Sequence, residues 1–71
     1  MKKVNSYNIY DEENYSTILY HAIASDEEQV KDLAKGRGID IEGLTIELEK
    51  TNIKDELGNP YRPIIEDAQV Y

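Results

Sequence analysis

The chain has 71 residues, with 15 acidic against 8 basic side chains for a formal net charge of −7, and it contains no Cys, Trp or Phe. This length supports one small domain, residues 1–71, whose single core supplies only about 3–5 kcal/mol of net stability. The lack of cysteine excludes a disulfide and a thiolate zinc site. The excess negative charge disfavours direct binding to nucleic acid and to anionic membranes.

The hydropathy pattern predicts no export signal and no membrane span. Two lysines follow Met1, but polar residues stand where the apolar part of a signal peptide would run. The longest apolar-leaning run, 18–24, is far shorter than the roughly 20 residues of a membrane helix, so we expect a cytoplasmic protein. Ile, Lys, Asn and Tyr make up 26 of the 71 residues, which is typical of low-GC bacteria and their phages and plasmids.

A β-hairpin is expected near the N-terminus. Residues 4–10 alternate, with Tyr7 and Ile9 on one side and mostly polar residues on the other, which is typical of a half-buried or edge strand. The acidic stretch 11–14 has turn chemistry. Residues 17–24 are largely apolar on both sides, which predicts a strand in the middle of the sheet with both faces covered.

A helix is expected directly after this strand. Ser25 and Glu28 have the spacing of a capping box, in which each side chain accepts a hydrogen bond from the other residue's backbone N–H. Gly36 or Gly38 ends the helix. The apolar face is a narrow stripe that can cover one face of a sheet. Its residues are Val30, Leu33 and Ala34.

The second half of the chain predicts another strand and a less certain tail. Leu44, Ile46 and Leu48 alternate with polar residues, and 57–60 has the composition of a turn, with a helical turn at 55–57 as an option. Residues 63–71 fit either a short strand or an extended segment packed on the sheet. The order predicts an α+β fold of the form ββαβ, with or without a fourth short C-terminal strand, and one helix packed on one face.

No motif for catalysis, a cofactor or a metal is present, so we expect a non-enzymatic protein without a cofactor. His21 is the only imidazole, and its place in a strand favours a hydrogen-bonded sheet histidine over a general base. The carboxylates lack the order of a calcium loop. The segment 36–38 lacks the third glycine of a phosphate loop and follows a helix instead of preceding one.

The six tyrosines are the only aromatic residues, and four lie in the expected hairpin. Tyrosine suits both a thin core and a protein interface, and both interpretations stay open. If the helix covers the face of the second strand that carries Leu19 and Ile23, the other face, with Ile18, Tyr20 and Ala22, needs a cover, which we expect in part from the C-terminal segment. The hairpin and the sheet edge then remain available for homodimerisation or for a partner. The expected interface comprises Tyr7, Tyr10, Tyr15, Ile18 and Tyr20.

The leading hypothesis is a small acidic interaction domain that binds another protein with a basic surface. Its sharper form is a phage- or plasmid-type inhibitor that masks a nucleic-acid-binding surface with carboxylates. The alternatives are a plain structural protein and a ligand-binding or enzyme-associated subunit whose pocket, lined by Tyr20, His21 and Tyr61, is completed by dimerisation. The expected acidic steering face comprises Asp11, Glu12, Glu13, Glu47 and Glu49.

Overall fold

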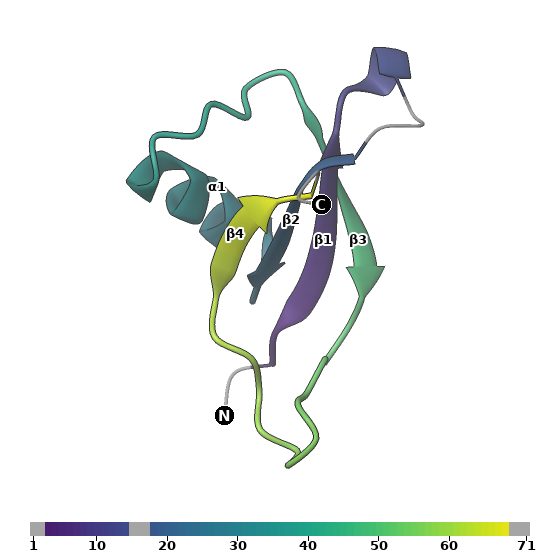
Figure 1. Ribbon diagram of the computed structural model, residues 1–71, viewed down its shortest axis with the longest axis vertical. Coiled ribbons are helices and arrows are strands. Elements are labelled where there is room, and N and C mark those ends of the chain that lie inside the picture. Colours follow the sequence, from purple (N-terminus) through teal and green to yellow (C-terminus); the bar gives the residue numbers. More distant parts are fainter. Residues whose placement is uncertain (1–2, 15–17, 69–71) are drawn as a thin grey trace.

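A computed structural model describes residues 3–14 and 18–68 of the chain. In chain order the elements are β1 (Asn5–Tyr10), the 3₁₀ turn η1 (Glu12–Asn14), β2 (Ile18–Ala24), α1 (Glu27–Gly36), β3 (Thr45–Lys50) and β4 (Ile64–Asp67). The strands form one antiparallel sheet in the order β3-β1-β2-β4, with α1 beside β2 and β4 (Figure 1). The predicted α+β class is confirmed, and the C-terminal segment contributes a fourth strand. Within the described residues, α1 is too short and too polar to cross a membrane.

The N-terminal hairpin forms the centre of the sheet. β1 pairs with β2 on one side and with β3 on the other, and β2 pairs with β1 and β4. The half-buried character predicted for β1 is confirmed, because Tyr7 and Ile9 are buried while Ser6 and Asn8 are only partly covered. The alternative of an edge position for β1 is wrong. The edges of this sheet are β3 and β4.

The hydrophobic core lies between α1 and one face of the sheet. Small alanines at two positions of β2 let the helix approach closely, and the loop 39–44 covers the part of the face that α1 does not reach. Ile39, Ile41 and Leu44 from this loop are half-buried against the core. The fully packed residues are Tyr7, Ile9, Ala22, Ala24, Val30, Ala34 and Ile65.

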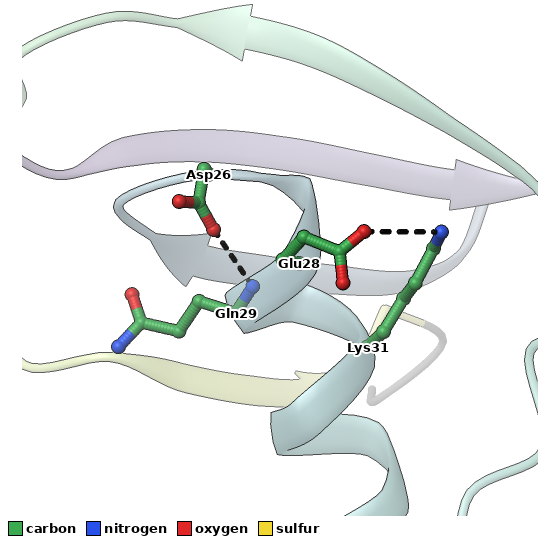
Figure 2. Close-up of polar contacts among 4 residues, drawn as sticks. All are labelled: Asp26, Glu28, Gln29 and Lys31. Atoms are coloured by element: carbon green, nitrogen blue, oxygen red, sulfur yellow. Dashed lines mark hydrogen bonds and ion pairs between the residues drawn. The ribbon is translucent and has the colours of Figure 1, made fainter.

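The start of α1 differs from the predicted capping box by one residue. The N-cap is Asp26, whose carboxylate accepts a hydrogen bond from the backbone N–H of Gln29 at 2.8 Å (Figure 2). The Gln29 side chain reaches back and accepts from the backbone N–H of Ser25 at 2.6 Å. Glu28, the expected partner of Ser25, instead faces Lys31 at 3.7 Å on the exposed side of the helix. The prediction is therefore wrong in register. Asp26, not Ser25, is the N-cap, and Gln29, not Glu28, is the residue whose side chain bonds the backbone N–H of Ser25.

The end of α1 is a Schellman motif. The N–H of Gly38 donates to Lys35 C=O at 3.2 Å, and the N–H of Ile39 donates to Ala34 C=O at 2.9 Å. Gly38 has φ +70°, a left-handed conformation that an L side chain rarely adopts. Of the two predicted stop residues, Gly38 is the one that ends the helix, while Gly36 is its last helical residue.

Residues 64–67 of the C-terminal segment join the edge of the sheet instead of covering a face. Ile65 of β4 pairs with Ala22 of β2, and Ile64 pairs with Ile23. The prediction that this segment packs on the second face of β2 is wrong, because β4 hydrogen-bonds in the plane of the sheet. The predicted cover on both faces of β2 is also wrong, since His21 is exposed. The tail residues 69–71 lie outside the described part of the chain.

The loop between β3 and β4 contains the predicted turn. The Asp55 carboxylate accepts from the backbone N–H groups of Leu57 and Asn59, both at 2.9 Å, and Lys54 forms a bridge with Pro60. This geometry leaves the Leu57 side chain 86% exposed at the tip. The turn is thus ordered by an aspartate acting on its own backbone.

Candidate functional site

The sheet face opposite α1 is the candidate site, and we call it the open face. Within residues 3–14 and 18–68, no helix or strand packs on it, and its side chains His21, Glu47 and Glu66 are exposed (Figure 1). Strand register and side-chain contacts assign its members. They are Ser6, Asn8 and Tyr10 of β1, Ile18, His21 and Ile23 of β2, Thr45, Glu47, Glu49 and Lys50 of β3, and Ile64 and Glu66 of β4.

One row of this face crosses all four strands. Asn8 pairs with Glu47 on one side and with His21 on the other, and His21 pairs with Glu66. Neighbouring strands lie about 4.8 Å apart, so two carboxylate positions flank the row at a backbone separation of about 14 Å. Between them, Asn8 Oδ1 accepts a hydrogen bond from His21 Nδ1 at 2.8 Å, because an amide oxygen only accepts. His21 is thus a hydrogen-bonded sheet histidine, as predicted.

The two glutamates of β3 are held in place by hydroxyl groups of β1. Tyr10 Oη donates to Glu47 Oε2 at 3.0 Å, and Ser6 Oγ donates to Glu49 Oε1 at 3.1 Å. Each carboxylate has about four acceptor positions, so one hydroxyl bond leaves capacity for a cationic donor. The arrangement fixes two negative charges on one strand, about 7 Å apart along its direction.

Two β-bulges shape this face. The register shifts between Ile9 and Tyr10 against β2, and again between Ser6 and Tyr7 against β3, which leaves Leu19 and Glu49 as the extra residues. A bulge bends its strand and redirects side chains. Consistent with this, the bulged Glu49 still reaches Ser6, although Ser6 is paired in register with Lys50.

A shallow hollow of about 220 Å³ lies at one end of the open face. Its walls are Asn8, Tyr10, Ile18 and Glu47. The structure therefore brings together two residues of the predicted interface, Tyr10 and Ile18, with one predicted steering acid, Glu47. Asn8 was missed, and only its alternation with the buried Tyr7 indicated that it faces solvent.

One end of the open face toward β4 carries an apolar pair. Ile23 and Ile64 are paired across strands, and Ile64 is 41% exposed. The sequence favoured Ile23 on the helix side of β2 and Ile64 in a cover for the opposite face. This assignment of faces is wrong, because Ala22 and Ala24 face the helix and Ile23 lies on the open face. The acids of β3 are thus separated by strand β1 from the isoleucine pair of β2 and β4 on the same face, a mixed composition that also occurs at interfaces with a polar rim.

The predicted interface does not form one surface. Tyr7 is 5% exposed and belongs to the core, and Tyr20 packs against the same core on the helix side of the sheet. Both are therefore corrected from interface to core, the role that tyrosine fills when its ring is buried. Tyr15 lies outside the described residues. Of the five predicted interface residues, Tyr10 and Ile18 lie on the open face.

The predicted acidic face is divided between two places. Glu47 and Glu49 lie on the open face, whereas Asp11, Glu12 and Glu13 lie at the hairpin tip beyond the end of β1 (Figure 1). The Asp11 carboxylate accepts from the backbone N–H of Glu13 at 3.0 Å, so it orders the tip. The two glutamates of the tip are exposed.

The three residues of the alternative ligand pocket do not share a wall. Tyr20 and His21 are consecutive in β2 and point to opposite faces of the sheet, while Tyr61 is exposed in the loop before β4. Among the described residues, no group of three His, Asp or Glu side chains is placed to hold a metal ion.

Comparison with known proteins adds no relative to this picture. No family model matches the chain, and no curated protein or solved structure matches it either. The functional argument therefore rests on the geometry of the open face. Its chemistry is that of a hydrogen-bond acceptor surface, with carboxylates and an amide oxygen at fixed positions beside aliphatic side chains.

Proposed function

We propose that the protein is a small acidic, non-catalytic interaction domain that binds a basic surface of another protein through the open face. The observation that carries the proposal is the pair of β3 carboxylates, Glu47 and Glu49, which hydroxyl groups of β1 hold in position on an uncovered sheet face. A net charge of −7 steers the chain toward a basic partner.

The structure reduces the entropic cost of such binding. Side chains on a four-stranded sheet lose less conformational freedom on docking than side chains on a loop, and the two hydroxyl bonds restrict Glu47 and Glu49 further. The neighbouring Ile23 and Ile64 supply apolar area that a partner can bury. The charges then determine the rate of association and the choice of partner, while burial of the two isoleucines contributes to affinity.

In its sharper form, the proposal is an inhibitor that occupies a nucleic-acid-binding surface. Glu47 and Glu49 lie along one strand, and Glu66 lies three strands away in the row of Glu47. Such a rigid set of negative charges meets lysine and arginine side chains that otherwise contact phosphates. Homodimerisation through the hairpin and a sheet edge, the other use expected for these elements, is tested by light scattering at high concentration.

The test is quantitative affinity capture from extracts of low-GC bacteria. The immobilised chain should retain a basic protein at about 50 mM salt and lose most of it at about 200 mM, because each ion pair between the two surfaces is screened. Glu47→Gln/Glu49→Gln should reduce capture at least tenfold. The matched control, Asp32→Asn/Glu56→Gln, makes the same change of charge at exposed positions outside the open face and should retain the partner.

The same experiment decides the inhibitor form. A captured protein, once purified, should bind a labelled DNA duplex or RNA, and the wild-type chain should displace that nucleic acid while the Glu47/Glu49 variant does not. Equal capture by both double variants would show that net charge alone accounts for binding, which would contradict the role of the open face.

A further inference from the structure

Strand β3 is an edge strand whose outer side is unpaired within residues 3–14 and 18–68 (Figure 1). Alternate residues of an edge strand direct backbone N–H and C=O groups outward, where another strand can bind them. β3 has six residues, against four in β4. In addition, the Arg37 side chain donates to Ile65 C=O of β4 at 2.5 Å, so part of the β4 backbone is already engaged.

The two faces of β3 differ in chemistry. Glu47 and Glu49 lie on the open face, whereas Ile46 and Leu48 lie on the helix side. Leu48 is 49% exposed, although it alternates in phase with the core. A strand added at this edge extends both faces, so its own side chains meet acids on one side and aliphatic groups on the other.

A groove of about 600 Å³ adjoins β3 on the helix side. It lies between α1, the loop 39–44 and the start of β3, and its apolar lining includes Ala34, Ile39 and Ile46. Lys31 and Lys35 stand at the helix wall of the groove. Asp40 and Glu42 line the same groove and offset these two ammonium groups, so the choice of face for the basic residues of an added strand rests on Glu47 and Glu49 of the open face.

A second copy of the chain places like charges opposite each other in two central registers of this edge, whereas a register centred on Ile46 places Glu47 opposite Thr45. If β3 pairs with its own copy about Glu47, the two Glu47 side chains stand opposite each other, and pairing about Leu48 places Glu47 opposite Glu49. Like charges directly opposite are destabilising. Pairing about the midpoint between Glu47 and Leu48 places an acid opposite a leucine. The same acids attract a strand with basic residues.

We propose that the β3 edge accepts an extended segment of the partner as a fifth strand, with Lys or Arg opposite Glu47 and Glu49 and aliphatic residues opposite Ile46 and Leu48. This inference rests on the proposed function, since it assigns the same two carboxylates to a basic partner, and it adds the mode of binding. Backbone hydrogen bonds supply affinity, and the alternation of basic and aliphatic residues supplies specificity.

Three synthetic heptapeptides of equal charge test the mode of binding. The first alternates lysine or arginine with valine. The second has the same composition, with the basic residues contiguous. The third keeps the alternating order and is made in two versions, with N-methyl groups on the odd or on the even residues. The methyl groups remove backbone N–H donors without changing the charge of the peptide. Fluorescence anisotropy should show the alternating peptide binding at least tenfold more tightly than the other two.

Hydrogen exchange locates the bound peptide. The alternating peptide should slow exchange of amides in 45–50 and leave those in 64–67 unchanged, and Glu47→Gln/Glu49→Gln should weaken its binding while Asp32→Asn/Glu56→Gln does not. Equal affinity for all three peptides, with sensitivity to Glu47 and Glu49, would overturn strand addition and leave the proposed function intact. Tight binding of the alternating peptide without slower exchange in β3 would also overturn it.

Discussion

Two consecutive isoleucines of β4 should respond very differently to the same substitution. Ile65 is fully buried in the core, while Ile64 is 41% exposed on the open face. Both occupy the same edge strand, pair with β2 and have the same β propensity. Replacing each in turn with valine therefore isolates the effect of burial, because strand length, charge and backbone stay the same.

The expected difference follows from the area and the packing involved. Ile65→Val removes a buried methylene and leaves a small cavity, which should cost about 1 kcal/mol. Ile64→Val removes a group that is only a little over half buried and leaves no cavity, so about 0.5 kcal/mol or less is expected. In a domain of this size, 1 kcal/mol corresponds to about 4–8 °C in Tm. Urea and thermal unfolding followed by circular dichroism measure both.

Equal destabilisation by the two variants, or a larger effect at Ile64, would refute the reasoning. A shift of β4 by one residue exchanges the faces of these two side chains, so such a result would also overturn the register against β2. Ile65→Ala is a less useful probe, because a loss of about 2–5 kcal/mol is comparable to the whole stability of so small a domain.

The helix termini provide two further predictions that urea unfolding can check. Asp26→Ala should lower the free energy of unfolding by about 1 kcal/mol because it removes the N-cap, whereas Glu28→Gln should change it by less than about 0.5 kcal/mol. A larger loss for Glu28→Gln than for Asp26→Ala would favour the Ser25/Glu28 capping box instead. Gly38→Ala should cost about 1 kcal/mol because of its positive φ, while Gly36→Ala should stabilise the helix by about 0.5 kcal/mol. Both glycines have room for a methyl group, so a similar loss at both would contradict the role of φ.

Local patterns in the sequence predicted most of the elements, but not their arrangement. The alternation around Tyr7 and Ile9 predicted the buried side of β1, and the turn residues predicted the hairpin. The position of β1 between β2 and β3 depends on which strands find each other across 35 or more residues of chain. No local pattern carries that information, since a central strand with one wet face alternates in the same way as an edge strand.

The candidate site was predicted in part, for a related reason. Tyr10 and Ile18 reach the open face, but Tyr7 and Tyr20 are in the core, because a tyrosine fits either environment and its face depends on register. The row that joins Glu47 to Glu66 requires the pairing of four strands and the positions of two bulges. Residue types alone indicated acidic and aromatic character, and the register assigned each residue to a face.

The acidic residues also differ in role according to the length of their side chains. Four of the six aspartates act on nearby backbone, since each of the four accepts a hydrogen bond from an N–H two to four residues later, as short polar side chains do at turns and caps. By contrast, the glutamates of β3 are bonded by hydroxyls of a neighbouring strand and face solvent. Part of the net charge is therefore structural, and asparagine could replace these aspartates as caps. The other part lies on the open face, where replacement by glutamine would remove the charge that a basic partner binds. The aspartates that cap backbone in this way are Asp11, Asp26, Asp40 and Asp55.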